Sequence, residues 1–474
     1  MGFGTTLSAF LNTNLSFIGA GQEALISMKQ LLLSLIFALV ALTGLQAQTI
    51  WDGTADTSWY NETSTKFEIS TAKQLAGLAE LVNNGNDFSG KTILLTADIV
   101  LNDTSDWENW ESSAPENTWT PIGNSNPFSG TFDGQGYDVS GIYINTYNGD
   151  CGLFSYNKGT IKNVGVTNSY IKGHSLVGGV CSDNDGTISN CHNSGTVSGN
   201  TFVGGVCGSN IGSISNCYNS GKVSGNSYVG GVCGQNYVTI SNCYNSGNIS
   251  GGDEIGGVCG RNPTGTISDC YNSGTISGKH NIGGVCGNFN GNTGTISDCY
   301  NSGAVSGTGT VGGVCGGIHF LVCPIYNCYY LQGTAAGGIE GRDVSGKAEV
   351  KTSEQFASGE VCWLLNEEQS EGAWRQKLDT DPYPVLDGPA VFKDGDIYYN
   401  EKTTAIEETN NEQASFVIVS ENLTINIYDN GHEATVFNLA GIVVYHGSER
   451  IIPVHNPGIY MVRIGNEVQK TIVR

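Results

Sequence analysis

Apolar positions between 178 and 330 recur in short β-branched runs punctuated by Gly, Asn and Ser, with no stretch long enough for a helix. Each unit reads V-G-G-V-C-G, a loop, T-I-S-N-C-Y-N-S-G and x-V-S-G, and ISNCYNSG stands unchanged at 214–221 and 240–247. Successive units are 26, 26, 26, 27 and 29 residues apart. A fixed period of this size is typical of a solenoid. We therefore predict an all-β fold, a β-solenoid of the right-handed parallel β-helix type, whose coils stack at about 4.8 Å.

The flanking segments have other patterns. Apolar residues at Leu75, Leu78, Leu81 and Val82 have helical spacing and predict a short N-terminal capping helix, with Ser70 as its N-cap. Residues 415–474 alternate apolar and polar positions and predict a small Ig-like β-sandwich. The exported chain is expected to divide into five parts: 48–149, the N-terminal cap and first coils; 150–330, the repeats; 331–400, the C-terminal cap that covers the open solenoid edge; 401–414, a polar, acidic linker; and 415–474, the terminal module.

The N-terminal region predicts export. Residues 28–47, MKQLLLSLIFALVALTGLQA, have a positive start, an apolar run and a small-residue exit, so they are expected to form a signal peptide cleaved after Ala47. Residues 1–27 are then an upstream extension from a misplaced start, with Met28 as the real one. The mature chain is expected to have no transmembrane segment.

Charge narrows the range of partners. The chain has 44 acidic residues against 21 Lys and Arg, a formal net charge of −23. Binding to nucleic acid or to anionic lipid requires clustered basic residues, so both are excluded as expected partners.

Cysteine occurs twice in every unit. The first series is Cys181, Cys207, Cys233, Cys259, Cys286 and Cys315, and the second is Cys191, Cys217, Cys243, Cys270, Cys299 and Cys328. In the degenerate first coil Phe154 and Val164 align with the two positions, which predicts that both rows are structural ladders facing the core, where a thiol acts as a small hydrophobe. In-coil disulfides remain an alternative, although the total of 15 is odd. Zinc is disfavoured, because its ligands are usually two to four residues apart.

Two further rows flank the second cysteine. The residues before it are Asn190, Asn216, Asn242, Asp269, Asp298 and Asn327, at a position where the chain must bend so that Ile and Cys both face inward. The residues after it are His192, Tyr218, Tyr244, Tyr271, Tyr300 and Tyr329. These rings are expected to stack into a stiffening stripe. The functional alternative is a flat ligand strip formed by Tyr218, Tyr244, Tyr271 and Tyr300. The glycine of N-S-G is expected to supply a turn with positive φ.

Candidate chemistry is sparse. Asp269 and Asp298 fall in consecutive coils, at a separation near that of the two carboxyls of retaining glycosidases, and such a pair could also hold Ca2+. The plainer interpretation is that Asp replaces Asn at a bend, with one carboxyl protonated by like-charge repulsion. The only His-Glu pair, His432-Glu433, is followed by Val436 and so cannot complete the metallopeptidase motif H-E-x-x-H. We therefore predict no catalytic, cofactor-binding or metal residues and a non-enzymatic protein, with a β-helix polysaccharide lyase or glycosidase as the alternative.

The motifs V-G-G-V-C-G, N-C-Y-N-S-G and x-V-S-G resemble the GLUG-motif family of bacterial surface proteins, over about 150–330. The resemblance implies a secreted or cell-surface protein that is adhesin-like or structural, with host glycans or matrix proteins as partners. The last 60 residues resemble the C-terminal sorting domain of the type IX secretion system of Bacteroidetes, on FNLAG at 437–441, Gly458, Tyr460 and Lys470. That resemblance implies that the type IX machinery carries the protein across the outer membrane, removes this domain and releases or anchors the rest.

Overall fold

The computed structural model describes residues 50–291, 293–318 and 324–400 and most of 416–473, namely 416–421, 424–429, 433–438, 443–449, 451–454, 458–464 and 467–473. The predicted upstream extension, signal peptide and linker lie outside these residues. The chain divides into two compact units, one ending at Glu401 and one beginning at Lys402. In the described residues, no helix is both long and apolar enough to cross a membrane.

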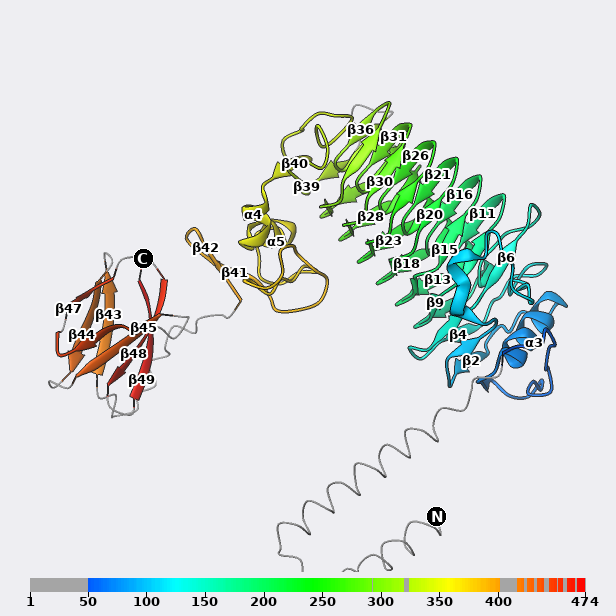
Figure 1. The fold of residues 1–474 in the computed structure, drawn as a ribbon, viewed down its shortest axis with the longest axis horizontal. Coiled ribbons are helices and arrows are strands. Elements are labelled where there is room, and N and C mark those ends of the chain that lie inside the picture. Colours follow the sequence, from blue (N-terminus) through cyan, green and yellow to red (C-terminus); the bar gives the residue numbers. More distant parts are fainter. Residues whose placement is uncertain are drawn as a thin grey trace, which may run out of the picture. The chain divides into compact units, whose positions relative to one another are not determined.

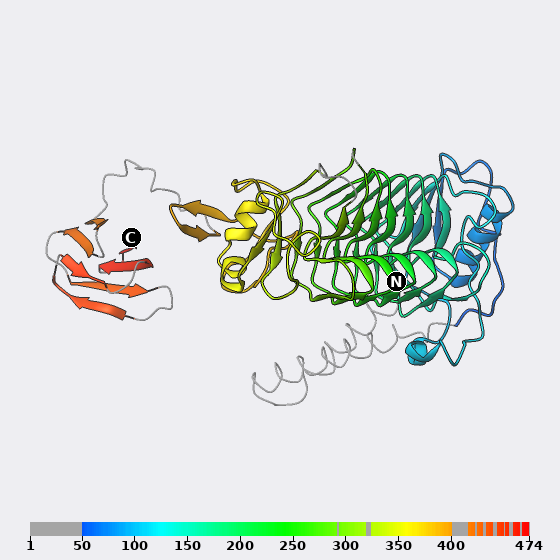
Figure 2. The same cartoon turned by 90° about the horizontal axis from the view of Figure 1, so that it is seen from above.

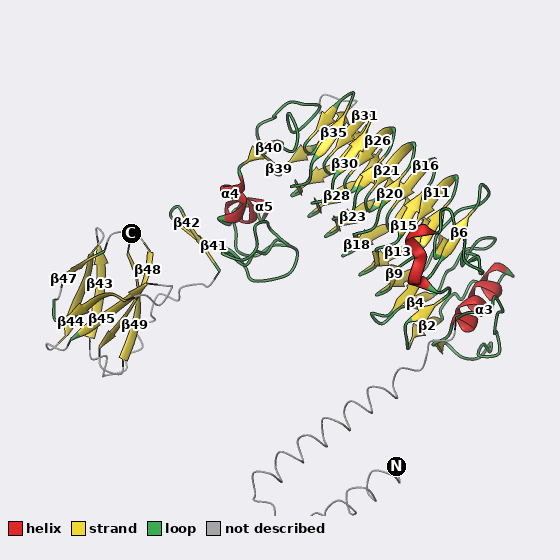
Figure 3. Ribbon diagram, in the orientation of Figure 1, coloured by secondary structure: helices red, strands yellow, loops and turns green. Residues whose placement is uncertain are grey.

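The first unit is a parallel β-solenoid, as the period predicts (Figure 1). Each full coil contributes one short strand to each of five parallel sheets, which run along the axis (Figure 3). The two longest sheets have ten strands each, so the solenoid continues on both sides of the repeats.

The strands of each sheet are as follows. The first ten-stranded sheet is β1 (Lys66–Ile69), β2 (Thr92–Leu95), β4 (Thr131–Asp133), β8 (Thr160–Lys162), β13 (Thr187–Ser189), β18 (Ser213–Ser215), β23 (Thr239–Ser241), β28 (Thr266–Ser268), β33 (Thr295–Ser297) and β38 (Ile325–Tyr326). The second is β3 (Ile99–Val100), β5 (Asp138–Ser140), β9 (Gly165–Thr167), β14 (His192–Asn193), β19 (Tyr218–Asn219), β24 (Tyr244–Asn245), β29 (Tyr271–Asn272), β34 (Tyr300–Asn301), β39 (Cys328–Leu331) and β40 (Ala348–Lys351).

Three shorter sheets complete the coils. One is β6 (Tyr143–Asn145), β10 (Tyr170–Lys172), β15 (Thr196–Ser198), β20 (Val223–Ser224), β25 (Ile249–Ser250), β30 (Ile276–Gly278) and β35 (Val305–Gly307). The next is β11 (Ser175–Gly178), β16 (Thr201–Gly204), β21 (Ser227–Gly230), β26 (Asp253–Gly256), β31 (His280–Gly283) and β36 (Val311–Gly312). The last is β7 (Phe154–Asn157), β12 (Cys181–Asn184), β17 (Cys207–Asn210), β22 (Cys233–Asn236), β27 (Cys259–Asn262), β32 (Cys286–Phe289) and β37 (Cys315–Ile318).

Pairing between coils joins equivalent residues of the repeat. Ile188 pairs with Ile214 and Ile161, and Cys181 pairs with Cys207 and with Phe154 of the degenerate coil. The bend before the second cysteine is also present, because all seven residues of that row, from Asn163 to Asn327, are left-handed with φ of 51° to 55°. Asn and Asp tolerate this conformation better than other residues with a Cβ.

The glycine of N-S-G has a different purpose from the one expected. Gly221 and its equivalents in neighbouring coils do not have positive φ. A Cβ on Gly221 would lie 2.0 Å from the carbonyl oxygen of Gly195, in the coil below. Close backbone approach between coils, rather than a left-handed turn, therefore requires glycine at this position.

Both ends of the solenoid are covered (Figure 2). At the N-terminal end lies α3 (Ala72–Asn83), which buries Leu75, Leu78 and Val82. The 3-10 helix η2 (Thr104–Asn109) lies against the side of the solenoid, where the following Trp110 packs on Tyr143 of β6. The N-cap of α3 is Thr71, whose side chain accepts from the Gln74 amide; the prediction of Ser70 was wrong by one residue, because the Ser70 amide instead donates to the Gln74 side chain. The C-terminal cap contains α4 (Ser353–Ala357), α5 (Glu360–Leu365) and the hairpin β41 (Phe392–Asp394) and β42 (Ile397–Tyr399).

The second unit consists of two antiparallel sheets that share one hydrophobic core, including Ile425, Ile452, Val436 and Val462. One sheet is β43 (Phe416–Glu421), β44 (Thr424–Asp429) and β47 (Ile451–Pro453). The other is β46 (Val443–Gly447), β45 (Ala434–Asn438), β48 (Gly458–Ile464) and β49 (Glu467–Val473).

Candidate ligand-binding face

The rings that follow the second cysteine form one stack along the solenoid. Centroid separations are 4.8 Å for His192–Tyr218, 4.9 Å for Tyr218–Tyr244, 4.8 Å for Tyr244–Tyr271 and 5.1 Å for Tyr271–Tyr300, with ring planes within 8° of parallel. Parallel pairing of β14, β19, β24, β29 and β34 holds the rings one coil apart. We call the half-buried part of this stack, Tyr218, Tyr244 and Tyr271, the tyrosine face.

Tyr300 does not belong to a surface strip, so its assignment as a ligand residue was wrong. Its side chain is 1% exposed, because Phe356 and Trp374 of the C-terminal cap pack against its ring, at 5.5 Å and 5.3 Å. Its hydroxyl donates to the Pro384 carbonyl at 2.6 Å. Tyr329, the next ring of the row, is also buried. The cap therefore closes the C-terminal end of the tyrosine face.

The stacking also changes what the tyrosine face can offer. Since each ring lies flat against the next, the ring faces are already in contact with each other. The rings thus stack as expected, and solvent meets the rims of Tyr218, Tyr244 and Tyr271, not the flat aromatic strip of the functional alternative. Burial raises the pKa of all three phenols, so they are neutral at physiological pH and can donate hydrogen bonds.

A column of amides runs beside these rings, at the left-handed bend. Asn190 Nδ2 donates to Asn163 Oδ1 at 3.0 Å, and Asn163 Nδ2 donates to Asp133 Oδ1 at 2.9 Å. Farther along, Asn242 Oδ1 is a buried acceptor with no hydrogen-bond partner among the described residues. A phenol and an amide thus recur together in successive coils.

At the N-terminal end of the stack the ring position is occupied by Gly165. His192 and Asp138 approach each other across it, with Nε2 and Oδ1 3.5 Å apart. A shallow pocket opens here, and its lining includes Gln135, Asn163, Gly165, Asn190 and His192. Burial lowers the pKa of His192 and raises the pKa of Asp138.

The two aspartates occupy adjacent coils, as predicted, because Ser268 pairs with Ser297 immediately before them. Burial, with a smaller contribution from the Asp298 charge, raises the pKa of Asp269 to about 6. Asp298 Oδ1 accepts from Asn327 Nδ2 at 2.6 Å, and the Asp298 carbonyl accepts from the Trp374 indole at 3.1 Å. Asp298 is thus tied to the C-terminal cap. Within the described part of the chain, no group of three or more His, Cys, Asp or Glu side chains could hold a metal ion.

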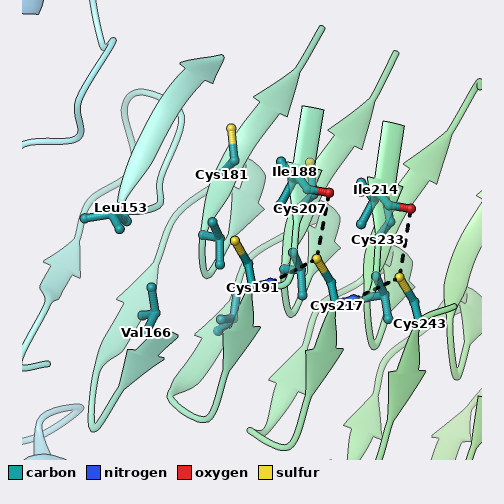
Figure 4. Packing of buried hydrophobic residues seen from close by; sticks show 14 of the residues in the cluster. Leu153, Val166, Cys181, Ile188, Cys191, Cys207, Ile214, Cys217, Cys233 and Cys243 are labelled. Carbon is teal, nitrogen blue, oxygen red and sulfur yellow. Dashed lines mark hydrogen bonds between the residues drawn. The ribbon is translucent and has the colours of Figure 1, made fainter. Parts of the chain in front are cut away.

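The twelve motif cysteines lie in two buried rows, three members of each being labelled in Figure 4. All fourteen described cysteines carry free, buried thiols, and Cys323 lies outside the described residues. Each motif thiol donates to a carbonyl two residues away, for example Cys207 Sγ to Ser209 O at 3.0 Å and Cys217 Sγ to Ser215 O at 3.1 Å. A small apolar side chain with a weak donor therefore suits both positions.

Sequence reasoning missed two fully buried asparagine ladders. In one, Nδ2 of each asparagine donates to Oδ1 of the next at 2.7 to 2.8 Å, through Asn193, Asn219, Asn245, Asn272 and Asn301. The other runs through Asn157, Asn184, Asn210, Asn236 and Asn262 at 2.7 to 3.1 Å and stops where Phe289 replaces asparagine. The constant Asn of Y-N-S-G and of C-G-x-N was the available signal.

The proposed sorting residues lie in the second unit. Gly458 and Tyr460 belong to β48, and Lys470 belongs to the neighbouring β49, where it pairs with Met461. Tyr460 is buried in the shared core, whereas Lys470 is exposed.

Two curated proteins are similar to part of this chain. Halomucin of Haloquadratum walsbyi is 30% identical over 154 residues, which is 31% of this chain and 2% of halomucin. A provisionally named Gly-rich membrane protein of Evansella cellulosilytica is 38% identical over 79 residues, 15% of this chain and 9% of that protein. The chain thus spans under a tenth of the length of either relative.

One solved structure, a provisionally titled immunoglobulin A1 protease from Bacteroides ovatus, superposes with a TM-score of 0.43 and 18% identity, over 69% of this chain and 93% of that one. Residues 225–250 match the family model described as the GLUG motif, a length equal to one 26-residue coil. The protein is therefore a β-solenoid that contains a GLUG repeat.

Proposed function

We propose that this protein is a secreted or cell-surface β-solenoid with an adhesive and structural role and no catalytic activity of its own. The observation that supports the adhesive role is the repetition in the tyrosine face. Phenols recur at 4.8 to 4.9 Å from Tyr218 to Tyr271, each beside a bend residue with a polar side chain. A polymer that repeats its hydroxyl groups at a similar interval meets the same contact in every coil, so weak contacts add through multivalency. Polysaccharides of the host surface have this chemistry, and matrix proteins are the second class of partner.

Removing only the phenol hydroxyls tests the adhesive role. The triple variant Tyr218→Phe, Tyr244→Phe and Tyr271→Phe keeps the ring stack intact and should bind an array of immobilised host glycans and matrix proteins at least about tenfold more weakly than the unaltered protein. The control is Tyr147→Phe, since Tyr147 is 83% exposed and lies outside the stack. Equal binding by the triple variant would exclude the tyrosine face. Failure of the unaltered protein to bind any member would exclude the adhesive role.

Glycan cleavage is the second candidate, and the raised pKa of Asp269, about 6, favours it, because a general acid must keep its proton near neutral pH. We would incubate the full chain with the polysaccharides that it binds and measure new reducing ends. Release that disappears in Asp269→Asn and in Asp298→Asn would establish an enzyme. No release from any bound glycan would reject this candidate.

Export by the type IX machinery follows from the resemblance of residues 415–474 to its sorting domain. Deleting these residues should leave the protein in the periplasm of its native host, with the solenoid still folded. Normal appearance of the truncated protein at the cell surface would contradict this assignment.

A further inference from the structure

Two neighbouring columns on the side formed by the β11–β36 and β7–β37 sheets carry a different residue in each of five coils. The first column is Leu176, Phe202, Tyr228, Glu254 and Asn281, and the second is Asp183, Ser209, Gln235, Arg261 and Asn288. The cation–π contact between Arg261 and Tyr228, at 5.2 Å, shows that the two columns are adjacent. We call these ten residues the variable face. A third column varies less, as Thr196, Lys222, Asn248, Thr275 and Ala304.

Exposure alone does not explain this variation. The first column is half-exposed in all five coils, whereas Ser209, Gln235 and Asn288 of the second column are buried. The residues that flank the repeated isoleucine are also half-exposed in most of these five coils, yet they are Ser or Thr in all five. They are Thr187, Ser213, Thr239, Thr266 and Thr295 before it, and Ser189, Ser215, Ser241, Ser268 and Ser297 after it. Positions as exposed as the first column therefore stay constant beside the repeated isoleucine, while the first column changes in every coil.

The backbone of the first column supports a role for its side chains. All five residues have left-handed φ values of 54° to 58°, a conformation that glycine adopts most easily and that is strained for bulky residues. The next coil makes room for the bend with a glycine, since a Cβ on Gly234 would lie 2.6 Å from the carbonyl carbon of Phe202. Leu176, Phe202 and Tyr228 therefore adopt a backbone conformation that costs free energy. Strain of this kind concentrates at functional sites.

The chemistry of the variable face changes along the axis. Phe202 and Tyr228 stack with centroids 4.9 Å apart, and Arg261 lies over Tyr228 while its Nε is 3.6 Å from Glu254 Oε2. Two acceptors, Asp183 Oδ1 and Asn288 Oδ1, are buried with no hydrogen-bond partner among the described residues. A buried oxygen without a hydrogen-bond partner costs free energy, which a donor from a ligand would recover.

The loop that follows the second column adds apolar surface. Ile211 and Tyr237 stand at equivalent positions of two consecutive coils, and Val238 follows Tyr237. Their exposed fractions are 50%, 38% and 44%. Exposed apolar residues in neighbouring coils, beside a polar and charged column, are typical of a surface that contacts another protein.

A ligand of identical units cannot match a surface that differs at each coil, whereas a polypeptide changes its side chain at every residue. We propose that the variable face binds an extended segment of a partner protein. Aliphatic or aromatic side chains of that segment contact Phe202 and Tyr228, and a Lys or Arg donates to Asp183. This site lies on different sheets from the tyrosine face and is independent of it.

Asparagine substitutions provide a test that the fold should tolerate. Asn281 already occupies the first column with φ of 55°, so Phe202→Asn and Tyr228→Asn place a residue that the coil accepts. The full chain would be used to select from a phage-displayed library of random dodecapeptides. Enriched peptides should share an aliphatic or aromatic residue together with Lys or Arg. Melting followed by circular dichroism checks that each variant remains folded.

Synthetic copies of the enriched peptides then give the decisive measurement. Their Kd should rise at least about tenfold on the double variant Phe202→Asn and Tyr228→Asn, and also on Asp183→Asn, while the Tyr218→Phe and Tyr244→Phe variant binds as before. Absence of a shared motif, or unchanged Kd on the folded double variant, would overturn the proposal. So would glycan binding that the double variant loses, because that result would assign the face to carbohydrate.

Discussion

Tyr271 and Tyr300 stack with ring planes 1° apart and centroids 5.1 Å apart, yet Tyr271 reaches solvent and Tyr300 does not. The two residues occupy the same position of consecutive coils, and only the C-terminal cap distinguishes them. The stack therefore passes from a surface element to a core element within one coil spacing.

Removing the phenol hydroxyl should separate these two environments. Tyr300→Phe leaves the Pro384 carbonyl without its donor in a buried site, so it should lower the free energy of unfolding by about 1 to 2 kcal/mol. Tyr218→Phe, at a half-buried position, should change it by less than about 0.5 kcal/mol. Chemical denaturation followed by circular dichroism measures both. Equal effects would show that the cap does not bury Tyr300.

The asparagine ladder predicts a larger loss. Asn219→Leu leaves the Asn193 amide, the Asn245 amide oxygen and the Gly221 carbonyl without their partners, all in buried positions. The expected loss is about 3 to 5 kcal/mol, since each unsatisfied group costs about 1 to 3 kcal/mol. Asn248→Leu, at an exposed position of the next coil, is the control and should stay within about 0.5 kcal/mol. A ladder variant as stable as the control would mean that these hydrogen bonds contribute nothing net.

The buried cysteines should resist modification. Burial raises the pKa of the Cys191, Cys299 and Cys328 thiols well above the usual value, which removes the reactive thiolate. Alkylation of the native protein should therefore be at least about 100-fold slower than that of an unfolded control, because it requires local opening. Mass spectrometry after alkylation in denaturant, without reductant, should find these thiols free. Mass differences that reveal disulfides would instead favour the in-coil bridges.

Asp269 should make stability depend on pH. Its pKa is about 6 in the fold against 3.8 ordinarily, so as pH rises from about 4 to 6 the unfolded chain ionises first and the fold loses stability. Asp269→Asn places the residue found in most other coils and should remove this loss. It should stabilise the protein at pH 7 by about 1 kcal/mol, a discounted value because the carboxyl reaches solvent, and have little effect below pH 4. A benefit that is equal at both pH values would contradict the titration of Asp269.

Because two coils share an identical octapeptide, one repeat should be removable without loss of the fold. Deleting residues 214–239 joins Ser213 to Ile240, the start of an identical octapeptide, so Tyr244 would stack on His192 and Asn245 would accept from Asn193. The shortened protein should fold, with a rod shorter by about 4.8 Å in small-angle scattering. Loss of cooperative unfolding would show that the coils are not interchangeable.

The sequence predicted the coils, their register and the bend, because the repeat itself aligns equivalent residues. The sequence did not indicate that Asn190 and Asn193 lie in different environments. The first lies on the surface at the left-handed bend and the second is fully buried, since the bend breaks the simple in-out alternation of a strand. Burial of Tyr300 was also not predictable, because its partner Pro384 lies 84 residues away and no local pattern reports that contact.

The ordering of coils along one axis also has a mechanical meaning. A pull between the two capped ends of the solenoid acts along the hydrogen bonds that join neighbouring coils, including both asparagine ladders. The bonds of one interface share the load, whereas successive interfaces carry it in series, so the coil with the weakest interface gives way first. Each 26-residue coil that opens then releases about 85 to 95 Å of chain. A surface-anchored rod of this construction would lengthen under tension in steps of nearly constant size, absorbing work coil by coil instead of detaching at once.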